Sequence, residues 1–491
     1  MMGLTPAQLM HIGFQFILDS MAPSSAYGRA ALSALKPFKQ AEERARELDN
    51  LEKLLELRRE HQEFVRRLEH LMMGTKDIRV SLELCAQGKV LTDIELFEIK
   101  SFLLQLEDII LLFNRLNEFA GLTSLGFQTS GGALTLLDPE ENRVASFYLS
   151  ERYSEKLAGI RQKKRAAELE IRRCEDVEEK ERLMSQRQKL VALEQAEEAR
   201  IRAALSRKLT PYVPSLLHNC NTIARLDLLV QKVALVQRFG GAKPQLGADA
   251  IVLTKMRNPM LATALEGEGK TYTPVSITLQ EGATVITGAN MGGKSVVLKT
   301  LALNILLCHC GFYSFSEAAQ MPAFDSIYLV SEDLEAASRG LSSFGGEIVR
   351  LKEVTERLQS EFSIVLLDEF ARGTNPDEGA AIAWALTRWL DSQRTFAVLT
   401  THFEHVAEAA GAHWRVAGMT GIDWNKLKRE IETQALADGI SLIARHMNYG
   451  LLQISEQEKI PHDAIEICGL LGFSNDIIDA AKKKLLTFGK K

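Results

Sequence analysis

The sequence predicts a long α-helical region followed by an α/β domain with a mostly parallel sheet. Apolar residues recur at helical spacing through most of the first half of the chain. In the second half, short β-prone apolar runs alternate with helical segments, and a glycine-rich loop joins one run to a helix. With 491 residues, 46% of them hydrophobic, the chain has material for about two to four domains.

The composition is ordinary for a protein with packed cores. The charged fraction is 25% and the formal net charge is −5, so any nucleic-acid binding must come from a local basic patch. Of six cysteines only Cys308 and Cys310 are close, and their spacing within an apolar helix does not suit zinc, so buried free thiols are expected. No signal peptide and no apolar run of transmembrane length is recognised, which predicts a cytoplasmic protein without membrane partners.

Residues 1–120 and 209–240 are expected to form one helical core domain. Residues 40–72 carry apolar side chains at spacings of three, four and seven, and Thr92 with Glu95 forms a capping box that opens an apolar helix. Residues 212–239 return to the same spacing and are expected to pack on the N-terminal helices. The apolar stripes are interpreted as packing faces, with a ligand groove as the alternative.

Residues 121–149 are expected to form a small joint between helical pieces. Two short apolar runs, 133–137 and 144–149, flank a turn rich in acidic residues with one proline. This pattern predicts a β-hairpin.

Residues 150–208 are expected to form a protruding arm of two antiparallel helices that break near residues 174–177. The segment is dense in Lys, Arg, Glu, Gln and Ala, which is typical of exposed helices. Basic residues that make the arm somewhat basic include Lys163, Lys164, Arg165, Arg172, Arg173, Arg182, Arg187, Lys189, Arg200, Arg202, Arg207 and Lys208. A solvent-exposed coiled-coil face is the favoured interpretation, and a surface that binds nucleic acid is the alternative.

Residues 246–491 are expected to form the catalytic α/β domain, after a linker-like glycine-rich segment at 240–247. The five β-prone runs are residues 251–253, 284–287, 327–330, 364–367 and 396–400. Because several are apolar throughout and separated by helices, a mostly parallel sheet covered on both faces is predicted.

The loop that follows the run 284–287 has the spacing of a phosphate-binding loop. Gly288, four further residues, and then Gly293, Lys294 and Ser295 match that pattern. Glycines let backbone N–H groups close around a polyphosphate, and the following helix N-terminus adds its positive end. Lys294 is expected to reach the phosphates of ATP and Ser295 to bind Mg²⁺.

Two later strands end in residues suited to the same reaction. Asp368 follows the run 364–367 and suits the Mg²⁺ shell, and Glu369 could polarise a water molecule. His402 follows the last run and could sense the γ-phosphate or orient that water, with a structural histidine as the alternative. A further loop, Ser342 to Glu347, leads into a helix whose N-terminus suits an anion.

These segments resemble the MutS family of mismatch-repair ATPases. The segment Thr287 to Ser295 is similar to that family's ATP loop, because its Asn-Met-Gly-Gly-Lys-Ser core is more particular than the general pattern. The segments 368–385, 331–347, 257–259, 400–402 and 449–484 also look like family segments. The resemblance covers about residues 246–485 closely and 1–240 loosely, as lever and clamp helices.

The resemblance implies a P-loop ATPase domain of the ABC/MutS type that works as a dimer. Ser342 would complete the partner's ATP site in trans, Tyr272 would stack on adenine, and Asn290 would contact the phosphates. The residues implied to bind the nucleotide are Gly288, Ala289, Asn290, Met291, Gly292, Gly293, Lys294, Ser295, Val296, Tyr272 and Ser342. Lys294, Glu369 and His402 would act in hydrolysis, and Ser295 and Asp368 would bind Mg²⁺.

Departures from the family pattern limit what the resemblance implies. Lever-like helices begin near residue 5, so the family's mismatch-recognition domains have no room, and the clamp-like arm is short. No C-terminal nuclease extension is recognised. Ala289 and Val296 replace a proline and a threonine, and residues 461–464 depart from an expected Ser-aromatic-Gly segment.

The leading hypothesis is a dimeric MutS-like ATPase that moves its helical levers around DNA without mismatch recognition. Its partner subunit would be a second copy or a related MutS-like chain, and DNA would be gripped through Lys and Arg of 160–208. The alternative is an ATP-dependent factor that remodels or reactivates a protein, for example a cobalamin-dependent aminomutase, with no DNA role. A scaffold with a dead nucleotide site is disfavoured by Lys294, Asp368 and Glu369.

Overall fold

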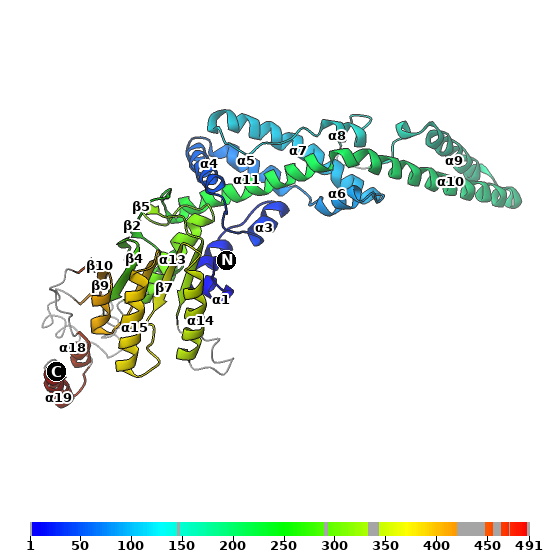
Figure 1. Cartoon of the computed structure of the whole chain (residues 1–491). Coiled ribbons are helices and arrows are strands. Elements are labelled where there is room, and N and C mark those ends of the chain that lie inside the picture. Colours follow the sequence, from blue (N-terminus) through cyan, green and yellow to red (C-terminus); the bar gives the residue numbers. More distant parts are fainter. Residues whose placement is uncertain are drawn as a thin grey trace. The chain divides into compact units, whose positions relative to one another are not determined.

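The computed structural model describes residues 2–144, 148–288, 293–331, 343–419, 447–454, 463–470 and 472–488. The chain divides into two compact units, drawn in Figure 1. The sheet unit comprises Met1–Ser20, Lys36–Leu48 and Leu235–Lys491, and the helical unit comprises Met21–Leu35 and Asp49–Ala234. In the described residues, no helix has the length and apolar character needed to cross a membrane.

The helical unit contains the long helices that the apolar spacing predicts. Its helices, two of them shared with the sheet unit, are α3 (Ala26–Ser33), α4 (Ala41–Glu60, shared), α5 (Gln62–Met73), α6 (Arg79–Ala86), α7 (Asp93–Ala120), α8 (Gly131–Leu137), η1 (Glu151–Tyr153), α9 (Glu155–Arg173), α10 (Val177–Leu209), η2 (Thr210–Tyr212) and α11 (Val213–Phe239, shared). The capping box is confirmed, since Thr92 and Glu95 exchange side-chain-to-backbone hydrogen bonds at the start of α7.

The expected break in the arm is also confirmed, because α9 ends at Arg173 and α10 begins at Val177. The two helices are held side by side by ion pairs. Arg161 Nε lies 2.9 Å from Glu194 Oε1, and Arg187 Nε lies 2.8 Å from Glu168 Oε1. The Arg161 side chain is only 5% exposed, so its charge needs these carboxylate partners to remain in the interior.

The β-hairpin expected at 121–149 is wrong for its first run. Residues 131–137 form α8, which buries Ala133, Leu134 and Leu137. These positions are separated by one and three residues, which places them on one helical face. A run of five residues, four of them apolar, is too short to separate helix from strand by periodicity.

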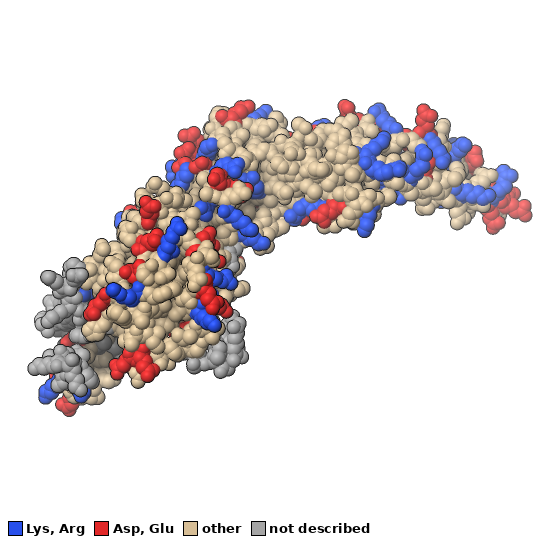
Figure 2. Space-filling model, viewed as in Figure 1, with Lys and Arg blue, Asp and Glu red and all other residues tan. Residues whose placement is uncertain are grey.

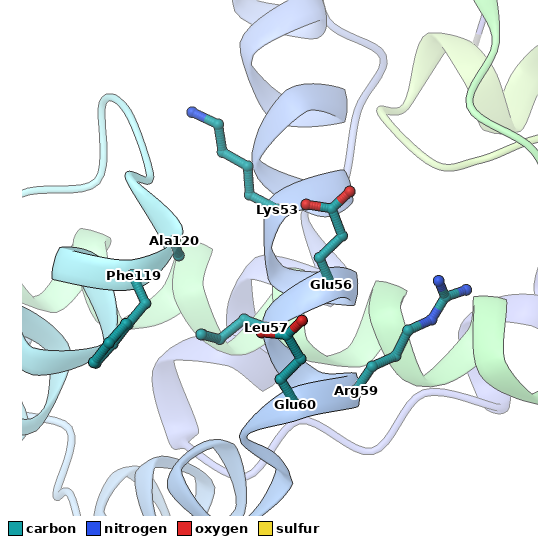
Figure 3. A pocket seen from close by; sticks show the side chains of 7 residues that line it. All are labelled: Lys53, Glu56, Leu57, Arg59, Glu60, Phe119 and Ala120. Carbon is teal, nitrogen blue, oxygen red and sulfur yellow. The ribbon is translucent and has the colours of Figure 1, made fainter.

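A cavity of about 350 Å³ lies in the helical unit between α4 and the end of α7 (Figure 3). Its lining residues are Lys53, Glu56, Leu57, Arg59, Glu60, Phe119 and Ala120. None of them belongs to the set that the sequence predicts to bind a nucleotide, and the lining carries two acidic and two basic side chains.

The sheet unit is organised around a six-stranded sheet in the order β10-β9-β4-β8-β7-β6. The strands are β4 (Gly282–Thr287), β6 (Ser326–Val330), β7 (Ser363–Asp368), β8 (Phe396–Thr400), β9 (Ala412–Gly418) and β10 (Asn448–Gln453). All neighbours are parallel except β10, which pairs antiparallel with β9. Four of the five expected strands lie in this sheet.

The fifth expected strand, β2 (Ile251–Met256), belongs to a separate four-stranded sheet with the order β1-β5-β2-β3. Its other strands are β1 (Gln245–Leu246), β3 (Val275–Leu279) and β5 (Ala318–Met321). The glycine-rich segment 240–247 is therefore not only a linker, because Gln245 and Leu246 pair with β5.

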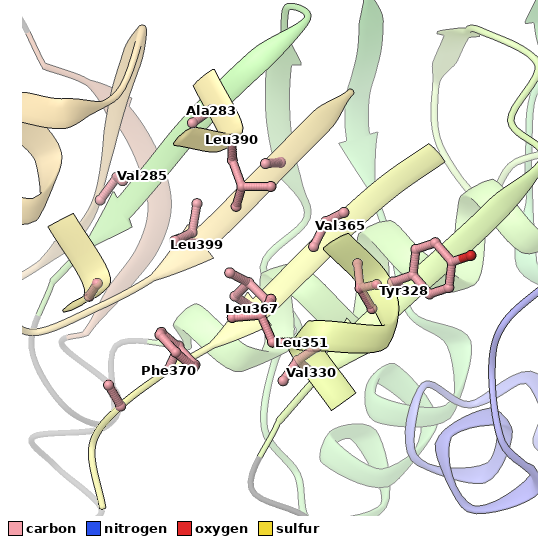
Figure 4. Packing of buried hydrophobic residues seen from close by; sticks show 14 of the residues in the cluster. Ala283, Val285, Tyr328, Val330, Leu351, Val365, Leu367, Phe370, Leu390 and Leu399 are labelled. Atoms are coloured by element: carbon pink, nitrogen blue, oxygen red, sulfur yellow. The ribbon is translucent and has the colours of Figure 1, made fainter. Parts of the chain in front are cut away.

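Helices cover both faces of the six-stranded sheet. α13 (Lys294–His309) packs on one face and contacts β6, β7 and β8. α14 (Ser343–Arg357) and α15 (Pro376–Asp391) cover the other face. Figure 4 shows the core on that face, where alternate strand residues such as Val285, Val365 and Leu399 meet apolar side chains of the covering helices. A sheet covered on both faces explains why its strands are apolar throughout.

Within the described residues, the remaining elements of the sheet unit are α1 (Pro6–His11), α2 (Phe14–Asp19), α12 (Pro259–Gly267), η4 (Glu404–Ala409), α18 (Asp463–Leu470) and α19 (Asn475–Phe488).

The expected boundary of the helical domain is wrong at the N-terminus, because residues 1–20 belong to the sheet unit. They hydrogen-bond to the outer edge of β6. Ile327 N–H donates to Met2 O at 2.8 Å, and the Gln8 amide donates to Leu329 O at 2.7 Å. The segment therefore satisfies backbone groups of the edge strand β6. Helical periodicity in residues 6–19 predicts the helices but not this pairing with β6.

A buried histidine makes the stability of the sheet unit depend on pH. His309 is 1% exposed; one ring nitrogen bonds to Ile305 O at 2.8 Å and the other accepts from Phe324 N–H at 2.9 Å. Burial lowers the pKa of His309 to about 4, and the Arg44 charge acts in the same direction, while Ile305 O and Asp325 oppose it. The folded unit therefore holds the neutral imidazole.

We expect the sheet unit to lose about 2 kcal/mol of stability between about pH 7.5 and pH 5 from this group. The folded pKa lies below the unfolded value of 6.5, so the stabilisation is complete above pH 6.5 and declines as pH falls toward 4. Denaturant unfolding followed by tryptophan fluorescence measures it, because all four tryptophans lie between residues 384 and 424 of that unit. His309→Gln should flatten this dependence, and an unchanged pH profile in that variant would contradict the assignment.

Candidate nucleotide site

Three strand ends meet at one edge of the six-stranded sheet. β4, β8 and β7 are parallel neighbours, and the register places Thr400 opposite both Ile286 and Asp368. The loop that starts at Gly288, the carboxylates at the end of β7 and the histidine after β8 therefore emerge at the same edge. Ligands of open α/β sheets bind at such carboxyl ends.

The ends of the glycine-rich loop have the backbone that the motif requires. Gly288 has φ +141°, and a Cβ there would lie 3.2 Å from the Cβ of Val416. Gly293 precedes α13 with φ +89°, a left-handed conformation that glycine adopts without strain. Ala289, Asn290, Met291 and Gly292 lie outside the described residues, so their predicted contacts stay predictions.

Lys294 begins α13, and its side chain reaches back to Gly288. Its Nζ donates to Gly288 O at 2.8 Å and lies 3.5 Å from Glu369 Oε1. The side chain is 3% exposed, and burial lowers the pKa of Lys294, while the Glu369 carboxylate opposes that shift. A cation held in a desolvated position interacts strongly with a phosphate, because little water screens it.

Ser295 and Asp368 meet as the sequence predicts. The Ser295 hydroxyl donates to Asp368 Oδ1 at 2.8 Å. Two adjacent oxygen ligands of an octahedral Mg²⁺ lie about 2.9 Å apart, given metal–oxygen distances of about 2.0–2.1 Å. A hydroxyl and a carboxylate are hard oxygen donors, so the pair fits the cation. Val296, predicted to bind the nucleotide, is partly buried in the first turn of α13.

Glu369 lies in a sharp turn directly after β7. Its φ is +49° and that of Ala371 is +65°, both uncommon for residues with a side chain. One carboxylate oxygen faces Lys294, and the other accepts from Arg372 Nη1 at 2.7 Å. The turn is also held from α14, because Ala371 N–H donates to the buried carboxylate of Glu347 at 3.1 Å.

His402 is exposed beside Phe403, with ring centroids 4.4 Å apart. Partial burial lowers the pKa of His402; Glu369 opposes that shift, and Lys294 and Arg372 add to it. The histidine is therefore within electrostatic reach of the residues predicted to act in hydrolysis.

Tyr272 is partly buried next to α13. Its hydroxyl accepts from Asn258 N–H at 3.2 Å and lies 3.5 Å from Thr300 Oγ1. Burial raises the pKa of Tyr272, so the phenol is neutral. Adenine stacking on its ring stays a prediction. Ser342 lies outside the described residues, and its predicted role in a partner's site stays a prediction as well.

Three residues around this edge were not predicted to have a role. Arg372 binds the Glu369 carboxylate, Glu347 holds the turn after β7, and Thr400 lies between both carboxylate residues. Thr400 and Arg372 lie in the segments 400–402 and 368–385 that resemble the family. The neighbours of Thr400, however, depend on the register between β7 and β8, which neither strand's sequence predicts.

Comparison with known proteins identifies the family of this site. The family model for MutS domain V matches residues 284–471. Endonuclease MutS2 of Enterococcus faecalis is 29% identical over 299 residues, which cover 60% of this chain and 35% of that protein. Endonuclease MutS2 of Synechocystis sp. is 34% identical over 235 residues, which cover 43% of this chain and 29% of that protein. The similarity thus spans about a third of the length of these relatives. Residues 284–471, which contain the loop, the carboxylates and the histidine described above, therefore match MutS domain V.

Proposed function

We propose that this chain is a Mg²⁺-dependent ATPase whose nucleotide site is completed by a second subunit. The observation that carries the proposal is the convergence of Lys294, Ser295 and Asp368, which come from α13 and β7, more than 70 positions apart in sequence, at one sheet edge. Calorimetric titration of the purified chain with MgATP tests it, and absence of binding at millimolar nucleotide would contradict it.

Each residue has a role that follows from its position. Lys294 binds the phosphates as a desolvated cation. Ser295 and Asp368 hold Mg²⁺, which when bound neutralises charge on the phosphate oxygens. Glu369 accepts a proton from the attacking water, and His402 orients that water or contacts the γ-phosphate. Asn290 and Tyr272 contribute phosphate and adenine contacts, and Ser342 acts on the partner's nucleotide.

We further propose that the ATPase cycle moves the helical unit around DNA, without mismatch recognition. The similar proteins are named endonucleases, which supports nucleic acid as the class of partner. We expect the affinity of the arm for DNA to be modest, because many of its cations are neutralised by glutamates. Lys156, Arg161, Lys164, Arg165, Arg182, Arg187 and Arg200 pair with glutamates of the arm itself. Figure 2 shows acidic and basic side chains side by side there.

Seven exposed cations of residues 160–208 remain for phosphates. Lys163, Arg172, Arg173, Lys180, Lys189, Arg207 and Lys208 make no ion pair with any residue that the structure describes. Because they are exposed on helix surfaces, their contacts would be with the backbone of DNA and would carry little sequence information.

We expect DNA affinity to fall about 100-fold between 50 and 200 mM salt, if about four of these cations contact phosphates. The physical reason is the release of counterions from DNA, one per neutralised phosphate. Fluorescence anisotropy of labelled duplex and branched DNA measures the slope. Replacing Arg172 and Arg173 together by Ala should reduce the slope by about 2. No affinity for either DNA even at 50 mM salt would remove DNA from the proposal.

A further inference from the structure

We infer that Thr400 is a positioning residue that fixes both carboxylates of the nucleotide site. The inference rests on the proposed ATPase function and assigns a role to a residue outside the phosphate loop. Thr400 is the last residue of β8 and is 1% exposed.

The hydroxyl of Thr400 connects two neighbouring acidic residues. It donates to Asp368 Oδ1 at 2.8 Å and accepts from the backbone N–H of Glu369 at 2.9 Å. An ionised carboxylate can only accept and a backbone N–H can only donate, so the single hydroxyl hydrogen points to Asp368. Leu367 O lies 3.5 Å away and is the weaker acceptor.

The consequence for Asp368 is a fixed carboxylate. Its Oδ1 accepts from two hydroxyls, those of Ser295 and Thr400, which approach from α13 and β8. Hydrogen bonds to a metal-binding carboxylate set its orientation, and losing such a partner typically weakens metal binding by about 10–100-fold.

The consequence for Glu369 is a fixed backbone. Its N–H lies 2.9 Å from Thr400 Oγ1 and 3.2 Å from Thr400 O, and its φ is +49°. Bonds to its only backbone donor help to hold this uncommon conformation, which directs the carboxylate toward Lys294. The side chain of Thr400 therefore fixes the orientation of both Asp368, the metal-binding carboxylate, and Glu369, the proton acceptor.

The chain offers a matched control at the other end of the same strand pair. Thr395 directly precedes β8, is fully buried, and donates its hydroxyl to Ser363 O at 2.7 Å. Thr395→Val and Thr400→Val each remove one buried hydroxyl that bridges β8 to β7. Of these two threonines, only Thr400 contacts Asp368 and Glu369.

The test measures binding of Mn²⁺·ATP by electron paramagnetic resonance, with Mn²⁺ in place of Mg²⁺. Thr400→Val is expected to weaken metal-dependent ATP binding by about 10–100-fold, and Thr395→Val to leave it unchanged. Thr400→Ser keeps the hydroxyl and should restore most of the affinity, whereas Thr400→Ala should not. This Ser and Ala pair decides the question if Thr400→Val does not fold.

Equal Mn²⁺·ATP affinities for Thr400→Ser, Thr400→Ala and the wild-type chain would overturn the inference. So would an equal loss in Thr395→Val and Thr400→Val, because the effect would then report on general packing. If the wild-type chain binds no Mn²⁺·ATP, the proposed function itself has failed, which is a different result from either of these.

Discussion

Lys294→Ala is expected to abolish ATP binding. The lysine is a buried cation at the start of α13, with Nζ 2.8 Å from Gly288 O. Removing one partner of a desolvated charge pair costs about 2–5 kcal/mol, so the affinity should fall at least about 30-fold. Calorimetric titration with MgATP measures the change.

The control is Lys299→Ala, which removes a lysine from the same helix five positions further on. That variant should bind ATP like the wild-type chain. Unchanged nucleotide affinity in Lys294→Ala, with normal folding by circular dichroism, would refute the assignment of the phosphate loop.

Glu369→Gln is expected to bind ATP but to hydrolyse it about 10²–10⁴-fold more slowly. The amide has nearly the same shape as the carboxylate but cannot accept the proton of the attacking water. Although the amide also lacks the negative charge, Lys294 would keep its bond to Gly288 O and remain available to phosphate. Single-turnover hydrolysis measures the rate, and light scattering after chromatography with ATP detects the closed dimer that should accumulate.

The matched variant is Glu353→Gln, an exposed glutamate of α14, which should turn over normally and form no trapped dimer. Normal turnover in Glu369→Gln would place the general base elsewhere. His402 would then be the next candidate, because it lies within electrostatic reach of the same residues.

The sequence predicts which residues meet at this sheet edge where local chemistry and strand order suffice. The loop spacing indicates Lys294 and Ser295, and an apolar run followed by two acids indicates Asp368. Because parallel strands present their ends at one edge, their meeting follows without knowing the register. In the structure, Ser295 and Asp368 lie 2.8 Å apart, as this reasoning predicts.

The residues that sequence reasoning missed depend on register or on long-range packing. Thr400 is opposite Asp368 only because β8 and β7 pair as they do. The run 133–137 is predicted as a strand because so short an apolar run fits either period, and packing decides between helix and strand. Residues 2–20 were expected with the helical domain because their edge-strand contacts are separated from them by more than 300 positions.

The attachment of the N-terminal residues to β6 makes the sheet unit a discontinuous domain. Ile327 N–H and Leu329 O find their partners more than 300 positions earlier in the polypeptide. A fragment that begins near residue 240 would leave this strand with unsatisfied backbone groups, a template for association with other chains. During synthesis, β6 is made long after its N-terminal partner. The hydrogen bonds of Met2 and Gln8 to β6 therefore cannot form until the second half of the chain has been synthesised.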